Sequence, residues 1–78
     1  MDFGKAIRLL KDGKKVARSG WNGKGMYLYL KRFPSYNDEI VSNFYEYCIV
    51  MFTADKKHQP GWLASQTDIL AEDWVEVA

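Results

Sequence analysis

The 78-residue sequence predicts a small α+β domain built on an antiparallel β-sheet, with an N-terminal helix and a short C-terminal helix. Three observations support this class. Apolar residues recur at helical spacing at the start of the chain, apolar and aromatic residues dominate the centre, and a helix-capping signal lies near the end. A chain of this length has room for one domain, which we place at residues 1–78.

The first element is a helix from Phe3 to Asp12. Asp2 is a suitable N-cap, and Gly13 is a typical residue for ending a helix. Apolar side chains follow the helical period at Phe3, Ala6, Ile7 and Leu10. Charged residues lie on the other side, so the helix is predicted to cover one face of a sheet.

Strands are expected next, at residues 14–19 and 26–33. They are separated by a glycine-rich turn over residues 20–25, in which Asn22-Gly23 favours positive φ angles. The second strand alternates, with Met26, Leu28 and Leu30 on one face. Pro34 is expected to end it, and residues 35–43 are polar and read as a long loop.

The third strand, at residues 44–53, is apolar on both faces, which favours a central strand or one covered by a subunit. A loop is predicted at residues 55–61. Ser65 and Asp68 have the spacing of a helix cap, which predicts a helix over residues 66–72 with Ile69 and Leu70 inward. Residues 74–77 form the last predicted strand.

Charge and cysteine content limit the classes of function. The chain has 11 Lys and Arg residues against 10 Asp and Glu residues, so long nucleic acid is an unsuitable partner. Its longest apolar run, Cys48 to Phe52, is too short to cross a membrane, and no signal peptide is evident. A single cysteine excludes an internal disulfide and is typical of the cytoplasm. We therefore expect self-association to supply additional stability.

No catalytic, cofactor or metal motif is evident. Cys48 lies in an apolar strand, where a buried thiol is the simplest interpretation, and His58 lies in a polar loop, where we expect it to be solvated. One cysteine and one histidine cannot complete a tetrahedral zinc site within one chain. The sequence therefore predicts a binding protein rather than an enzyme.

The tryptophans are the most informative residues. Trp74 begins an apolar strand and is predicted to lie in the core. Trp21 and Trp62 each follow a glycine at the edge of a turn, so either the core or a ligand or subunit surface is possible for them. The glycines around Trp21 lack the spacing of a phosphate-binding Walker loop. An aromatic ring near the cap at Ser65 would suit a nucleotide, with its base stacked and its phosphate at the helix start.

Two stretches carry a resemblance to a known family. "DFGKAIRLLKDGKKVARSGWNGKGMYLYL" and "PGWLASQTDILAEDW", separated by an aromatic strand, resemble the Thoeris anti-defence 2 family of small phage and prophage proteins. The resemblance implies a homotetramer that sequesters glycocyclic ADP-ribose, the signal of the Thoeris system, without cleaving it. It also implies action in the cytoplasm of the host bacterium. Some members bind cyclic oligonucleotides of the CBASS defence system at a separate site.

The same resemblance implies a ligand pocket between subunits. The candidate ligand-binding residues are Trp21, Asn22, Met26, Trp62, Ser65 and Asp68. The candidates for neutralising phosphate are Arg18, Lys24 and Arg32. Two alternatives remain open: a module that binds a host protein through the same aromatic surface, and a single-stranded nucleic-acid binder, against which the net charge argues.

Overall fold

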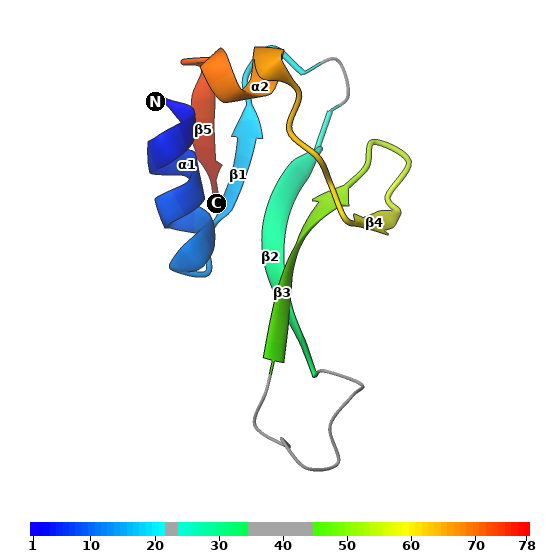
Figure 1. The fold of residues 1–78 in the computed structure, drawn as a ribbon. Helices are drawn as coiled ribbons and strands as arrows, with labels where there is room; N and C mark the ends of the chain where they lie inside the picture. The colour runs from blue at the N-terminus through cyan, green and yellow to red at the C-terminus, as the bar shows by residue number, and fades with distance from the viewer. Residues whose placement is uncertain (22–23, 35–44) are drawn as a thin grey trace.

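The computed structural model describes residues 1–21, 24–34 and 45–78. Five strands form one sheet in the order β4-β3-β2-β1-β5, and every neighbouring pair is antiparallel (Figure 1). The elements are α1 (Phe3–Lys11), β1 (Lys15–Arg18), β2 (Tyr27–Pro34), β3 (Tyr45–Phe52), β4 (His58–Pro60), α2 (Gln66–Leu70) and β5 (Trp74–Val77). The predicted α+β class is confirmed. The predicted loop at residues 35–43, the start of the third strand at Phe44, and Asn22-Gly23 lie outside the described residues.

Helix α1 begins and ends as its sequence predicts, apart from one residue. The Asp2 carboxylate accepts the Lys5 N–H at 2.8 Å, which caps the first turn. Asp12 is the C-cap rather than the last helical residue, and Gly13 follows with φ +84°. Since this left-handed conformation is costly for residues with a Cβ, glycine suits the position.

Exchanging glycine for alanine at the two ends of α1 should have opposite effects. Gly13→Ala is expected to lower the free energy of unfolding by about 1–2 kcal/mol, because alanine is strained at positive φ. Gly4→Ala, within α1, should raise it by up to about 1 kcal/mol, because alanine favours the helix. Its Cβ would meet the Asp2 carboxylate only at ordinary contact distance, 3.5 Å. Urea unfolding measures both, and equal signs for the two variants would contradict the prediction.

The core lies between α1 and one face of the sheet. It is formed by Ala6, Leu10, Val16, Leu28 and Trp74. Val16 is directly opposite Leu28 on the neighbouring strand, which places both side chains on the same face. Trp74 is 1% exposed, as predicted for a core residue. At one end of the molecule α2 lies close to β5 (Figure 1).

Strands β2 and β3 form a long two-stranded ribbon that extends beyond β1 (Figure 1). Pro34 belongs to β2, opposite Tyr45, so the strand is displaced by one residue from the predicted 26–33. On the face opposite α1 the ribbon carries stacked rings, with 4.9 Å between the centres of Tyr27 and Phe52. Lys15 lies over Tyr27, with its Nζ 4.8 Å from the ring centre.

The predicted loop at residues 55–61 is wrong over its second half, because β4 pairs there with β3. Three residues that include a proline give no period for a sequence pattern to detect. His58, predicted to be solvated, is exposed but has specific partners. Its Nδ1 lies 2.8 Å from the Tyr29 hydroxyl oxygen, and its ring centre lies 5.0 Å from that of Phe52.

Helix α2 is shorter than the predicted 66–72, ending at Leu70 with Ala71 as its C-cap. The expectation that Ile69 and Leu70 point inward is also wrong, because they are 48% and 78% exposed. The physical reason is that α2 is attached to the domain through Asp68, a polar residue, rather than through its aliphatic side chains.

Candidate functional site

Trp21 and Trp62 both pack against the buried ring of Trp74. Both are half-buried, and both meet Trp74 edge to face, at centroid distances of 5.6 Å and 6.2 Å. Their backbones are fixed as well. The Trp21 N–H donates to the Arg18 carbonyl at 3.2 Å, and the Trp62 N–H donates to the Ile49 carbonyl of β3 at 3.0 Å. Trp21 and Trp62, which we together call the tryptophan wall, are 41 positions apart in the sequence and share Trp74 as their support.

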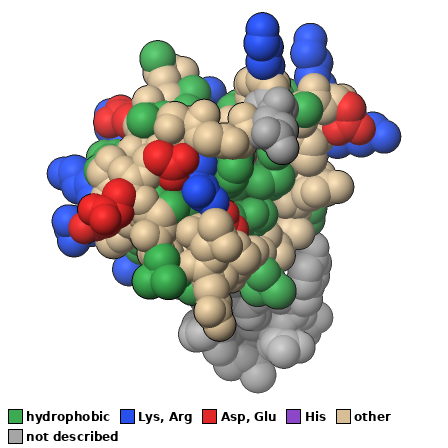
Figure 2. Space-filling view, turned by 90° about the horizontal axis from the view of Figure 1, so that it is seen from above, with side chains coloured by type: hydrophobic (Ala, Val, Ile, Leu, Met, Phe, Trp, Pro, Cys, Tyr) green, Lys and Arg blue, Asp and Glu red, His purple; other side chains and the backbone are tan. Residues whose placement is uncertain are grey.

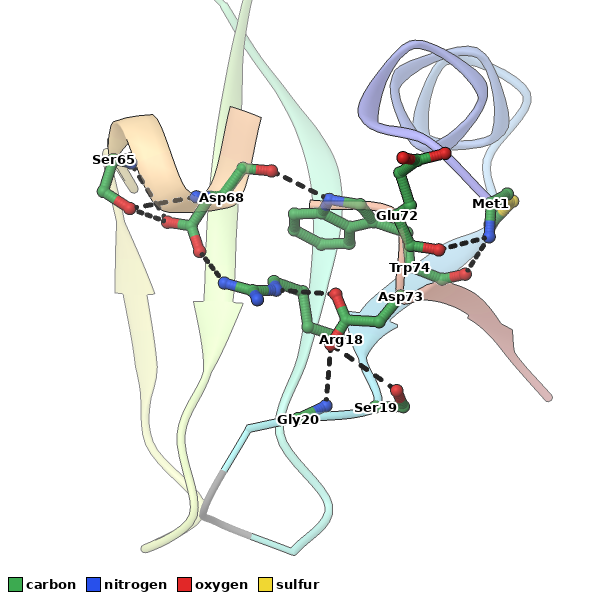
Figure 3. A network of polar contacts seen from close by, with 9 residues as sticks. All are labelled: Met1, Arg18, Ser19, Gly20, Ser65, Asp68, Glu72, Asp73 and Trp74. Carbon is green, nitrogen blue, oxygen red and sulfur yellow. Dashed lines mark hydrogen bonds and ion pairs between the residues drawn. The ribbon is translucent and has the colours of Figure 1, made fainter. Parts of the chain in front are cut away.

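Beside this wall, three charged residues join β1 to α2 and to the start of β5 (Figure 3). We call Arg18, Asp68 and Asp73 the Arg18 cluster. The Arg18 guanidinium donates from Nε to Asp73 and from Nη1 to Asp68, each at 2.9 Å. Asp73 also accepts the Gly20 N–H at 3.0 Å, next to Trp21. Since Arg18 already faces two carboxylates, it is poorly suited to neutralising a ligand phosphate, and its evident task is to hold these segments together.

Ser65 and Asp68 are also engaged within the chain. Ser65 Oγ accepts the Asp68 N–H at 3.1 Å, and the Asp68 carboxylate accepts the Ser65 N–H at 3.0 Å, which completes a capping box (Figure 3). The Asp68 carbonyl accepts the Trp74 Nε1–H at 3.0 Å. Of the backbone N–H groups at this helix start, where a ligand phosphate was predicted, that of Ser65 is thus occupied by Asp68. These contacts connect α2 to the base of the tryptophan wall.

The charges of the Arg18 cluster shift one another's pKa values. Burial raises the pKa of Asp68, but hydrogen bonds from the Ser65 N–H and from Arg18 outweigh this and leave it below the ordinary 3.8. The hydrogen bond from Arg18 lowers the pKa of Asp73, with a further contribution from the Gly20 N–H. The same two partners, first Asp73 and then Asp68, raise the pKa of Arg18.

Stability should therefore fall in acid. A carboxylate with a lowered pKa contributes its full stabilisation above its ordinary value, here 3.8, and loses it as the pH falls through the lowered value. We expect the urea concentration at the midpoint of unfolding to fall as the pH drops below about 4, because the unfolded chain then binds protons at both aspartates while the folded protein still keeps them ionised. In Asp73→Asn the drop should be smaller, since one of the two groups no longer titrates. An equal acid dependence in both proteins would contradict this assignment.

The remaining predicted residues are more dispersed. Met26 is half-buried just before β2, Lys24 is exposed in the preceding turn, and Asn22 lies outside the described residues. Arg32 lies near the other end of β2. At about 3.3 Å per residue, this places it about 20 Å from Met26 within one chain. A single chain therefore brings Trp21, Trp62, Ser65 and Asp68 into one region but does not bring Arg32 there.

Three hollows on the described surface have volumes between 330 and 390 Å³, and none of the three is lined by the tryptophan wall or the Arg18 cluster. Seen from the α2 end, hydrophobic side chains reach the surface beside acidic and basic groups (Figure 2). Trp21 and Trp62 are half-buried, so each keeps part of its surface exposed in one chain. A ligand held against them would be enclosed if a second surface covered it.

Sequence reasoning missed one group of side chains. Two of the hollows meet at Tyr29 and His58 on the sheet face opposite α1, and Lys15 and Lys31 line them. The alternation of Tyr27 and Tyr29 on β2 was a detectable signal for an aromatic face. The participation of His58 was not detectable, since it depends on β4.

Other features of the described residues bear on the class of protein. None of their helices is long and apolar enough to cross a membrane. In the same part of the chain no three histidine, cysteine or carboxylate side chains gather as a metal site would require.

Comparison with known proteins agrees with the motifs. Residues 1–77 match the model of the Thoeris anti-defence 2-like domain. The chain is also similar to the protein named Thoeris anti-defence 2 of Bacillus phage SP01, with 45% identity over 82 residues that cover 95% of this chain and 91% of the relative. A family model that spans nearly the whole chain and a relative of this identity show that the chain belongs to the Thoeris anti-defence 2-like family.

Proposed function

We propose that this protein blocks Thoeris immunity by binding glycocyclic ADP-ribose and holding it without cleavage. The observation that carries the proposal is the family match over residues 1–77, together with a phage relative whose name states anti-Thoeris defence. A sponge of this kind needs tight binding and no turnover. Nanomolar affinity corresponds to about −12 kcal/mol of binding free energy.

The tryptophan wall supports the proposal chemically. Indole rings with one exposed side offer a surface on which adenine can stack, and Trp21 and Trp62 are both half-buried with a fixed backbone. A small ligand with two phosphates needs only a few cations, which agrees with a net charge of +1. Lys24, exposed in the turn after Trp21, is the better-placed phosphate candidate, because Arg18 is held by two aspartates.

The exposed part of the wall also favours the homotetramer that the family resemblance implies. A pocket completed by a neighbouring subunit would bury most of a nucleotide-sized ligand. Arg32, distant from the wall within one chain, would have to reach it from another subunit. The proposed place of action is the host cytoplasm, where the signal is made.

A thermal-shift panel of cyclic ADP-ribose isomers and cyclic oligonucleotides tests this function. A ligand at a hundred times its dissociation constant should add about 2.7 kcal/mol to the free energy of unfolding. We expect glycocyclic ADP-ribose to give that shift, and a further shift with a cyclic oligonucleotide would extend the function to CBASS. Absence of a shift with every compound would overturn the proposal.

A further inference from the structure

The aliphatic side chains around α2 are unusually exposed for their size. Leu63, Ile69 and Leu70, which we call the α2 patch, are 88%, 48% and 78% exposed, and α2 has no buried residue. The segment is nevertheless held firmly by the capping box and the Arg18 cluster. A fixed segment that presents large aliphatic side chains to water is typical of an interaction surface.

A complementary hollow lies elsewhere on the same chain. The α1 groove, 390 Å³ in volume, runs between the C-terminal half of α1 and the β2–β3 ribbon, and its lining is mostly apolar. It is lined by Ile7, Leu10, Lys11, Leu30, Tyr47 and Ile49. Tyr47 is 61% exposed here, although it lies on the sheet face that α1 covers further along. The ribbon beyond β1 has only two strands, and such a ribbon needs cover to be stable in water.

The charges of the two surfaces are opposite. Helix α1 carries Lys5, Arg8 and Lys11 and no acidic residue. Residues 66–73 carry Asp68, Glu72 and Asp73 and no basic residue. Asp68 and Asp73 are paired with Arg18, whereas neither Lys11 nor Glu72 has an ion pair within the described part of the chain. Lys11 lines the groove and Glu72 follows the patch by two residues, so the two can face each other across a contact.

We propose that two copies of this chain dock reciprocally, with the α2 patch of each seated in the α1 groove of the other. The groove provides the apolar cover that Leu63 and Leu70 lack, and Lys11 opposite Glu72 fixes the register. Each copy gives a patch and accepts one, which closes the contact as a symmetric pair. This inference rests on the assembly part of the proposed function and names one of its interfaces; a tetramer needs a second interface, between two such pairs. It places the tryptophan wall, which adjoins α2, beside the second subunit.

Oligomeric mass, measured without ligand by light scattering and sedimentation over a range of concentrations, tests the docking. Leu70→Asp should shift the protein to a smaller species, whereas Val75→Asp, at a 43% exposed residue of β5, should leave the mass unchanged. Lys11→Glu and Glu72→Lys should each weaken association by roughly tenfold or more, and the double variant should restore it to within about threefold. Circular dichroism verifies that each variant is folded, and the two charge variants, at surface positions, provide the test if Leu70→Asp does not fold.

A monomeric wild-type protein at high concentration would overturn the docking. So would Leu70→Asp with an unchanged mass, or a double charge variant no better than the single ones. Because no ligand is present, these outcomes are separate from the sponge proposal. A monomer that still binds glycocyclic ADP-ribose would overturn the docking alone, and an assembled protein that binds no nucleotide would overturn the function alone.

Discussion

Trp74→Ala is expected to lower the free energy of unfolding by about 3–5 kcal/mol, the typical cost of removing a large buried aromatic side chain. Trp74 is 1% exposed and meets Phe3, Trp21 and Trp62 at centroid distances of 5.5, 5.6 and 6.2 Å. The substitution also leaves the Asp68 carbonyl without its indole donor. A chain of 78 residues has a total stability of about 4–12 kcal/mol, so much of it depends on this ring.

Urea unfolding followed by far-ultraviolet circular dichroism measures this effect. Val75→Ala is the matched control, because it changes the next residue of the same strand at a 43% exposed position. It should alter the free energy of unfolding by about 0.5 kcal/mol or less. If Trp74→Ala were as stable as this control, the placement of the core would be wrong.

Trp62→Ala is expected to weaken capture of glycocyclic ADP-ribose by about 5- to 150-fold, which corresponds to 1–3 kcal/mol for one stacked base. Trp62 is half-buried and meets Trp74 in an edge-to-face contact, so its loss should destabilise the fold less than the loss of Trp74. Trp62→Phe should retain part of the affinity, since a smaller ring can still stack.

Isothermal titration at a temperature where all variants are folded gives the dissociation constants. Tyr29→Ala serves as the control, because it removes an aromatic side chain from the sheet face opposite the core. If Tyr29→Ala weakened capture as much as Trp62→Ala, the ligand would have to be placed on the other face of the sheet.

Local patterns predicted those parts of the fold that depend on local physics. Helix α1 follows from its cap, its apolar period and Gly13, all within twelve positions. The capping box of Ser65 and Asp68 follows from a spacing of three residues. Trp74 was assigned to the core because it begins an apolar strand. In the first two cases the interactions that decide the structure lie within one element, and in the third the apolar pattern of the strand was enough to predict burial.

Contacts between distant residues account for what the sequence did not predict. Arg18 meets Asp68 and Asp73 across 50 and 55 positions, so its interpretation as a phosphate partner could not take these carboxylates into account. Ile69 and Leu70 were expected to point inward because apolar residues usually do. In α2 the contacts through Asp68 set the orientation instead. Strand β4 forms only because β3 offers an edge with which three residues can pair.

The most direct test of the central claim is the mass balance of the ligand. The protein is incubated with glycocyclic ADP-ribose, and the mixture is filtered through a membrane that retains the protein and lets free ligand pass. The retained protein is then denatured by heat, and the compound is quantified at each step by mass spectrometry. We expect the filtrate to lose the ligand and the heated protein to release it chemically intact. Ligand left free in the filtrate, or recovered as a cleaved product, would contradict the account.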